Sequence, residues 1–147
     1  MSLKVVMLVV ALLSFGNVKA QTFVCTDVTF TEQAKKDWNE SHRYNTKKNV
    51  LGSTLTLNVF DRNLKAIEED TDGTLYEYVF KKIGEYKYRF EDTMTDFESY
   101  NYYTDSYNQR KVRMDMDIQT RLGYYVSTTI RTYYDGKLML TLSFKRK

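Results

Sequence analysis

Along most of this chain, β-branched and aromatic residues alternate with polar ones. A period of two is typical of strands that bury one face and expose the other. The chain contains no proline, which suits long ladders because proline removes a hydrogen-bond donor from a strand. The alternation predicts strands over residues 23–30, 53–60, 64–69, 75–81, 85–91, 97–103, 111–119, 124–133 and 137–145.

Residues 31–40 have a helical pattern instead. Ala34 and Trp38 are four residues apart and would share one face of a helix. Either Thr29 or Thr31 can cap the first turn, because a threonine oxygen accepts from the free N–H groups there. We therefore predict one short helix near the N-terminus of the folded domain.

The loop Tyr134-Asp135-Gly136 bears on the register of the last two predicted strands. A two-residue Asp-Gly turn would place the leucines of the last strand beside polar residues of the strand before it. A three-residue loop, built as a type I turn with a glycine bulge at Gly136, shifts the register by one and makes one face apolar. We predict this loop, with Lys137 opposite Tyr133. The pairs Ile130–Leu140, Thr128–Leu142 and Val126–Phe144 would then lie on one face, and Thr129–Thr141 and Ser127–Ser143 on the other.

The same rule predicts three-residue loops at residues 82–84 and 71–73, each of which ends in glycine. The loop at 82–84 would place charge pairs on one face of its hairpin and an aromatic ladder on the other. Each such cross-strand pair contributes roughly 0.2 to 1 kcal/mol. The expected pairs are Lys81–Glu85, Glu77–Arg89, Phe80–Tyr86, Tyr78–Tyr88 and Tyr76–Phe90.

Short loops between successive strands describe an antiparallel meander. About eight strands in so short a chain favour closure into a small barrel or a strongly curled sheet. The predicted fold is therefore all-β, with one short N-terminal helix. In the strand at 111–119 we expect Val112, Met114, Met116 and Ile118 to point inward and Arg113, Asp115 and Asp117 outward.

This architecture resembles that of the calycin-like barrels, the lipocalins and their relatives, in which a meander encloses one small ligand. The resemblance lies in topology. Lipocalins carry a Gly-x-Trp motif at the start of the first barrel strand, whereas the only tryptophan here lies in Lys36-Asp37-Trp38, within the predicted helix. No binding residue is carried over from that family.

Residues 1–20 have the pattern of a cleaved export signal. A basic residue precedes an apolar run at 5–13, and the segment ends in valine, lysine and alanine at 18–20. Nine apolar residues are fewer than the roughly 20 that span a bilayer. We predict a secreted or periplasmic protein, with one barrel-like domain over residues 21–147 and no stable membrane insertion after cleavage.

The overall charge excludes some classes of partner. The net charge is +3, too small to predict nucleic-acid binding, which needs a concentrated basic surface. Residues 1–20 hold two lysines, so the remaining 127 residues carry 20 basic and 19 acidic side chains. Residues 61–105 hold 12 acids and 6 bases, and residues 106–147 hold 3 acids and 9 bases. Pairing between neighbouring strands would balance them; a solvated surface or a basic partner-binding face are the alternatives.

Sequence motifs for catalysis or metal binding are few. His42 stands in a polar stretch that resembles the exit from a helix, and Cys25 stands in an apolar strand where a buried thiol is expected. A single cysteine also excludes an internal disulfide and a cysteine-rich zinc site. Asp115 and Asp117 are expected to form a charge ladder with neighbouring bases. Residues 68–73 resemble a calcium loop but lack the closing glutamate, so we predict a hairpin turn there.

Tyrosine is the unusual residue, with 13 in the chain. Tyrosine combines a flat apolar face with a hydrogen-bonding tip, which is why binding surfaces favour it. The predicted aromatic ladder accounts for some tyrosines as packing, but the cluster at 100–107 has no such explanation. The candidate ligand-binding residues are Tyr76, Tyr78, Tyr86, Tyr88, Tyr100, Tyr102, Tyr103 and Tyr107.

Two hypotheses on function follow. The first is a noncatalytic exported binding protein, not an enzyme and without cofactor or metal, that holds a small apolar or sugar-like ligand in the barrel interior or on an aromatic sheet face. A cavity lined by Tyr76, Tyr78, Tyr86 and Val126 would favour it. The alternative is a protein-interaction module, such as an inhibitor or envelope-assembly factor, that uses a Tyr-rich edge and the basic C-terminal third.

Overall fold

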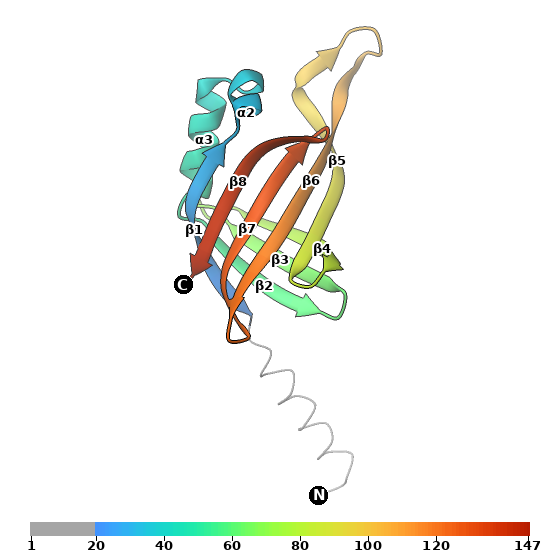
Figure 1. Cartoon of the computed structure of the whole chain (residues 1–147). Helices are drawn as coiled ribbons and strands as arrows, with labels where there is room; N and C mark the ends of the chain where they lie inside the picture. The colour runs from blue at the N-terminus through green and yellow to red at the C-terminus, as the bar shows by residue number, and fades with distance from the viewer. Residues whose placement is uncertain (1–19) are drawn as a thin grey trace, which may run out of the picture.

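The computed structural model describes residues 20–147, apart from the side chains of residues 96–99. The predicted export signal lies outside the described residues, Ala20 excepted. The eight strands form one closed antiparallel barrel in chain order, with β1 paired to β8 (Figure 1). This confirms the predicted all-β meander and its closure into a barrel. The elements are β1 (Gln21–Phe30), α2 (Glu32–Asp37), α3 (Glu40–Val50), β2 (Thr54–Phe60), β3 (Asn63–Glu69), β4 (Leu75–Gly84), β5 (Lys87–Asn101), β6 (Ser106–Arg121), β7 (Tyr124–Tyr134) and β8 (Lys137–Arg146).

The loops of the meander alternate between the two ends of the barrel (Figure 1). The upper end holds both helices, the β3–β4 loop and the tips of the β5–β6 and β7–β8 hairpins. The lower end holds the β2–β3, β4–β5 and β6–β7 turns, the start of β1 and the C-terminus. These two names are used in this sense below.

The chain between β1 and β2 forms two helices, where the sequence predicts one. Thr31 caps α2 as expected, since the Ala34 N–H donates to its Oγ1 at 3.2 Å. Asn39 then caps α3, where its Oδ1 accepts from the His42 N–H at 2.7 Å. The prediction of a helical exit around His42 is therefore wrong. No residue of α3 is buried, so the helix has no apolar face for a periodicity to reveal.

Neither α2 nor α3, the helices found within residues 20–147, is long and apolar enough to cross a membrane.

The predicted strands at 85–91 and 97–103 are one strand, β5, which pairs along its length with β6. The pairing has an irregularity between Asp96 and Tyr100. Both strands are longer than the others, and together they project beyond the upper end of the barrel (Figure 1).

The β7–β8 hairpin differs from its prediction. Tyr134 pairs with Lys137, so the turn has two residues, Asp135 and Gly136, both with positive φ. Ile130 lies opposite Leu142, where Leu140 was predicted. The observed pairs are otherwise Ser127–Lys145, Thr128–Phe144, Thr129–Ser143, Arg131–Thr141, Thr132–Leu140 and Tyr133–Leu138.

A bulge at Met139 explains why an Asp-Gly turn is compatible with an apolar face. The register shifts between Tyr133–Leu138 and Thr132–Leu140, so Met139 is one extra residue on β8. This insertion switches the face on which the following residues of β8 lie, so Leu140 and Leu142 point into the barrel interior. Thr31 binds the bulge, because its N–H donates to the Met139 carbonyl at 2.9 Å and its Oγ1 to the Leu138 carbonyl at 2.7 Å.

The β4–β5 hairpin also differs from its prediction. Gly84 pairs with Lys87 and the turn is formed by Glu85 and Tyr86, so the loop at 82–84 is wrong. The predicted ladder changes accordingly, with Lys81 opposite Arg89. Tyr86 takes a positive φ, the backbone state for which the prediction relied on glycine.

The β3–β4 loop is confirmed. The Asp70 N–H donates to the Thr74 carbonyl at 2.9 Å, and Gly73 has a φ of 88°. Residues 71–73 thus form the predicted three-residue loop, and the calcium-loop resemblance at 68–73 belongs to a hairpin turn.

Alanine substitution distinguishes these two glycines. Gly73→Ala places a Cβ in the left-handed region, so we expect a loss of about 1 kcal/mol in the free energy of unfolding. Gly84 has no positive φ, and an added Cβ would meet the Lys87 Cβ at 3.6 Å, an ordinary contact. Gly84→Ala should change stability by less than about 0.5 kcal/mol. Urea unfolding measures both, and equal losses would contradict the difference in backbone conformation.

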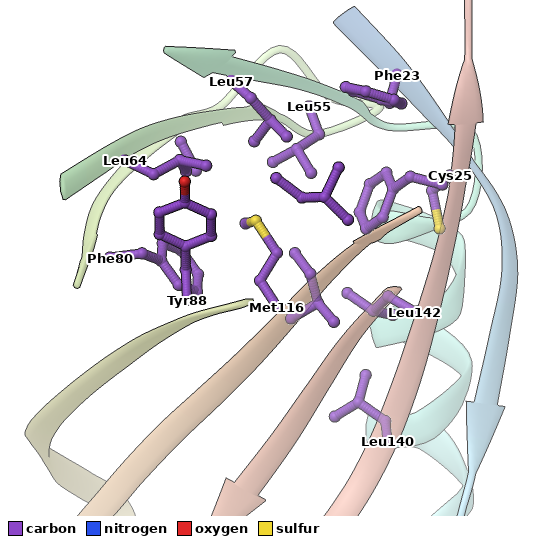
Figure 2. Packing of buried hydrophobic residues seen from close by; sticks show 14 of the residues in the cluster. Phe23, Cys25, Leu55, Leu57, Leu64, Phe80, Tyr88, Met116, Leu140 and Leu142 are labelled. Carbon is purple, nitrogen blue, oxygen red and sulfur yellow. The ribbon is translucent and has the colours of Figure 1, made fainter. Parts of the chain in front are cut away.

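The barrel interior is a packed apolar core (Figure 2). Inward positions alternate in much of the barrel, as the period of two predicts, and bulges such as that at Met139 interrupt the alternation. An aromatic group joins β4 to β5, with ring centroids of Tyr78 and Phe90 5.2 Å apart and of Phe80 and Phe90 5.9 Å apart. Val112, Met116 and Ile118 are buried and Met114 packs against the core, which confirms the predicted inward face of β6. The most buried large side chains are Phe23, Leu55, Leu64, Phe80, Met116, Met139 and Phe144.

Candidate binding surface

The tip of the β5–β6 hairpin exposes a group of tyrosines. Tyr102 is 86% exposed and Tyr103 101% exposed, although both are large aromatic side chains. Tyr100 and Tyr107 are partners across the two strands, and their ring centroids lie 5.3 Å apart. The Tyr102 ring packs edge-on against Tyr100 at 5.0 Å. The structure therefore brings together the four tyrosines of the 100–107 cluster, which we call the tyrosine tip.

Short polar side chains shape the turn that carries the tyrosine tip. The Asn101 Oδ1 accepts from the Tyr103 N–H at 3.0 Å, and the Thr104 Oγ1 lies 2.9 Å from the Ser106 Oγ. The Tyr100 hydroxyl donates to the Asp105 carboxylate, and this hydrogen bond raises the pKa of Tyr100. Asparagine and threonine stabilise turns in this way by hydrogen-bonding to nearby groups. The tip thus has a defined local structure.

A cleft of about 480 Å³ lies at the base of the hairpin, nearer the barrel. Both acidic and basic side chains line it, together with the backbone of the β7–β8 turn. Its volume lies within the range of small-molecule sites, roughly 300 to 1,000 Å³. The lining residues are Glu91, Asp92, Thr93, Lys111, Val112, Arg113 and Gly136.

The β7–β8 turn holds the base of the hairpin in place. The Asp135 N–H donates to the Lys111 carbonyl at 2.8 Å, and the Lys111 N–H donates to the Asp135 Oδ1 at 3.0 Å. Arg110 adds an ion pair with Asp135 at 3.7 Å. Two separate hairpins therefore meet beside the cleft, a contact between distant parts of the sequence.

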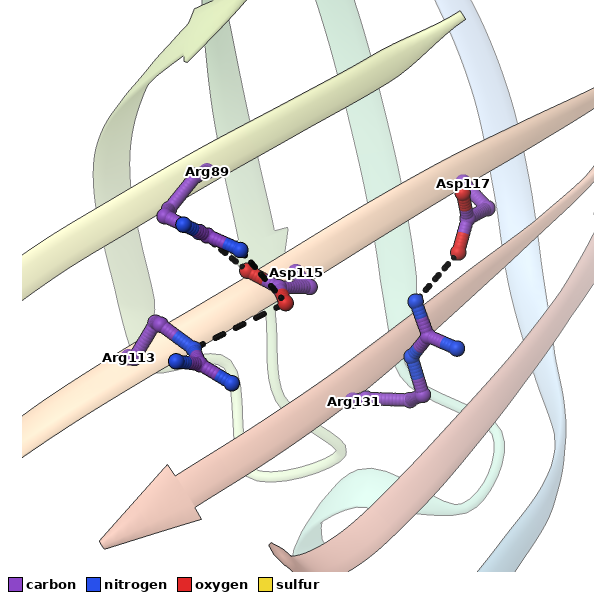
Figure 3. A network of polar contacts seen from close by, with 5 residues as sticks. All are labelled: Arg89, Arg113, Asp115, Asp117 and Arg131. Carbon is purple, nitrogen blue, oxygen red and sulfur yellow. Dashed lines mark hydrogen bonds and ion pairs between the residues drawn. The ribbon is translucent and has the colours of Figure 1, made fainter. Parts of the chain in front are cut away.

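Below the cleft, ion pairs cover the outer face of β5, β6 and β7 (Figure 3). The Arg89 Nε donates to the Asp115 Oδ1 at 2.7 Å, and Arg113 approaches the same carboxylate at 3.6 Å. Arg131 donates to Asp117 at 2.8 Å. These contacts confirm the predicted charge ladder, since both carboxylates are held by arginines on the outer face. Asp115 is only 7% exposed, so it is part of the packed wall of the barrel.

The other four candidate tyrosines do not converge on one site. Tyr76 lies at the upper end and is 42% exposed, whereas Tyr78 packs against the core. Tyr88 is buried, and Tyr86 lies in the β4–β5 turn at the lower end. Val126, predicted to share a cavity with them, is 38% exposed. The predicted lining of an interior cavity is thus divided among the core, the surface and both ends.

The upper end contains an acidic pair that the sequence analysis missed. Glu68 follows Leu64 and Ala66 on the inward side of β3, so burial raises the pKa of Glu68 to about 7. The neighbouring Asp70 charge and a side-chain hydrogen bond between the two carboxyl groups add to the shift. Burial also raises the pKa of Asp70. Glu68 therefore holds its proton to a higher pH than an ordinary glutamate does.

His42 and Cys25, whose side-chain types can act in catalysis, are both packed against other parts of the fold. His42 packs edge-on against Trp38, with ring centroids 4.8 Å apart, and Trp38 also contacts Phe30 and Tyr134. Cys25 is 2% exposed, and burial raises the pKa of its thiol to about 11. The expectation of a buried thiol is confirmed.

Most of the cleft residues also escaped the sequence analysis. Glu91, Asp92 and Lys111 have no motif, because they meet only where the β7–β8 turn reaches the β5–β6 hairpin. Glu68 had an available signal: it continues the inward positions Leu64 and Ala66 at a spacing of two. A carboxyl group at an inward position predicts a raised pKa.

Comparison with known proteins found no matching family model, no matching curated protein and no matching solved structure.

Proposed function

We propose that this is an exported, noncatalytic protein-interaction module that recognises a partner protein through the tyrosine tip. The exposure of Tyr102 and Tyr103 on a projecting hairpin is the observation that carries the proposal. Large aromatic side chains that are exposed together mark interaction sites, and tyrosine is enriched among the residues that dominate binding energy. The tip projects beyond the upper end of the barrel, which suits insertion into a concave partner surface (Figure 1).

Part of the basic C-terminal third lies away from the tyrosine tip. Arg113 and Arg131 are engaged with Asp115 and Asp117 on the barrel wall. Lys145 and Arg146 lie at the end of β8, at the lower end of the barrel. The proposed recognition surface is therefore aromatic and is confined to the tyrosine tip.

Site-specific photocrosslinking tests this proposal. A photoreactive phenylalanine at position 103 should give one discrete adduct with a partner protein in the native compartment. The same residue at position 124, which replaces an exposed tyrosine at the lower end (65% exposed), is the matched control and should not give that adduct. With the captured partner, Tyr102→Ser should weaken binding by about thirtyfold, the effect of an interface residue worth roughly 2 kcal/mol.

Two results would count against the tip as the recognition surface. One is the same adducts from both positions, and the other is an affinity that Tyr102→Ser leaves unchanged. Because Tyr102 is exposed, this substitution should leave thermal stability within about 0.5 kcal/mol of the parent protein. A lower affinity with unchanged stability therefore reports on binding.

A small polar or sugar-like ligand is the second candidate, and the cleft at the base of the hairpin is what favours it. Its volume of about 480 Å³ suits a small molecule, and its charged lining favours a polar ligand over an apolar one. Mass spectrometry of small molecules that copurify from the native compartment tests this candidate. Arg113→Gln, which changes a cleft residue, should abolish copurification.

A further inference from the structure

Apolar side chains are exposed at all three turns of the lower end. Phe60, beside the β2–β3 turn, is 60% exposed, and Ile83, before the β4–β5 turn, is 51% exposed. Leu122, in the β6–β7 turn, is 91% exposed, and Tyr124 beside it is 65% exposed. Several large apolar side chains exposed at one end of a barrel indicate an interaction site.

The same end carries an excess of positive charge. Residues 60–62, 81–87, 120–124 and 145–147, which we call the basic end, contain eight lysines and arginines against two carboxylates. All eight basic residues are exposed, and none forms an ion pair among the side chains that are described. They are Arg62, Lys81, Lys82, Lys87, Arg121, Lys145, Arg146 and Lys147.

Backbone hydrogen bonds join some of the segments at this end of the barrel. The Lys82 N–H donates to the Arg62 carbonyl at 2.8 Å, which joins the first two turns. The Lys147 N–H donates to the Thr22 carbonyl at 3.1 Å, which joins the C-terminus to β1. The third turn lies at the same end of the barrel (Figure 1).

We propose that the basic end docks peripherally on an anionic lipid bilayer. The interfacial layer of such a bilayer accepts aliphatic and aromatic side chains, while its headgroups attract lysine and arginine at about 1 kcal/mol per residue. A soluble polyanion such as nucleic acid would satisfy the cations but leave Leu122 and Ile83 exposed. The combination of apolar turns and unpaired cations therefore favours a membrane surface.

The charge at the opposite end is consistent with this orientation. Residues 90–109, which include the tyrosine tip, contain five acids and no lysine or arginine. Anionic headgroups would repel this segment, so the tip would face away from the lipid.

Vesicle cosedimentation tests the proposal with residues 21–147, which hold the whole barrel and its core. We expect binding to vesicles of phosphatidylcholine mixed with anionic phosphatidylglycerol, and no binding to phosphatidylcholine alone. Arg121→Glu with Lys145→Glu should lower the partition coefficient by roughly tenfold or more. Leu122→Asp should lower it by about tenfold through loss of apolar contact, and aspartate tolerates the positive φ of this position.

Matched variants at the upper end provide the controls. Lys47→Glu with Lys48→Glu makes the same charge change on exposed residues of α3, and Leu75→Asp makes the same change at another exposed leucine (64% exposed). Both should bind as the parent protein does, and circular dichroism should show that all variants are folded. Equal binding to neutral and anionic vesicles, equal losses in the controls, or retention on heparin without vesicle binding would each overturn the membrane assignment.

Discussion

Replacement of Phe80 by alanine is expected to lower the free energy of unfolding by about 4 kcal/mol. Phe80 is 1% exposed and lies at the junction of β3, β4 and β5, where its ring packs beside Tyr78 and Phe90. Removing a buried aromatic ring costs its transfer free energy and leaves a cavity that the surrounding strands only partly fill. Urea unfolding followed by circular dichroism measures the loss.

Phe60→Ala is the matched control, because Phe60, in strand β2, is 60% exposed. It should cost less than about 1 kcal/mol. Phe80→Leu, which keeps most of the buried volume, should cost about 1 kcal/mol and remain folded where Phe80→Ala is too unstable to measure. If both Phe80→Leu and Phe60→Ala changed the free energy of unfolding by close to zero, the result would contradict the packed core.

The protein is expected to lose stability as the pH rises from about 4.5 to about 7, because Glu68 binds its proton more tightly in the folded state. Burial and Asp70 raise the pKa of Glu68 from 4.5 to about 7. The stabilising contribution is complete below pH 4.5 and is lost as the pH rises through 7, since the unfolded chain releases this proton first. The expected loss is on the order of 3 kcal/mol.

Glu68→Gln isolates this effect. A glutamine amide is always neutral and can donate to Asp70, so the variant should lack most of the decline and be the more stable protein above pH 7. Glu69→Gln removes a carboxylate from the exposed side of the same strand and should follow the parent curve. Free energies of unfolding from urea titrations across this pH range measure the difference. A Glu68→Gln curve parallel to the parent would show that Glu68 ionises normally.

The two proposals assign different tasks to the two ends of the barrel. The basic end would hold the protein at a lipid surface, and the tyrosine tip would present an aromatic surface to a partner on the opposite side. The experiments separate them, because Tyr102→Ser changes only the tip and Leu122→Asp changes only the basic end.

Register shows where sequence reasoning succeeds and where it fails. The β3–β4 loop follows its prediction because Gly73 is the residue that takes the left-handed conformation. At the β4–β5 turn, Tyr86 takes that conformation although it is not glycine. In the β7–β8 hairpin, Leu140 and Leu142 lie on the predicted inward face, but their partners on β7 differ from the prediction. The turn has two residues and Met139 forms a bulge. A bulge depends on its partners, here Thr31, which is more than a hundred residues away in sequence.

The candidate surfaces also differ in whether the sequence alone could reveal them. The cluster at 100–107 is local, so the sequence alone could single it out, and the hairpin brings Tyr100 and Tyr107 together as a cross-strand pair. The tyrosines at 76–88 follow one sequence pattern, but they do not form one site. Each strand runs from one end of the barrel to the other, so residues along it lie at different heights in the barrel. The cleft and the acidic pair of Glu68 and Asp70 depend on which loops meet and how deeply a side chain is buried.

Sequence by itself determined the alternation, and with it the strands, the inward residues and the antiparallel meander, because a period of two is a local property of a half-buried strand. Only the tertiary structure decided the registers, since bulges and turn conformations are selected by contacts with distant residues. It also decided which charges are paired and which gather at the basic end. Closure of the barrel brings together turns that are separated by tens of residues, and no local pattern records that contact.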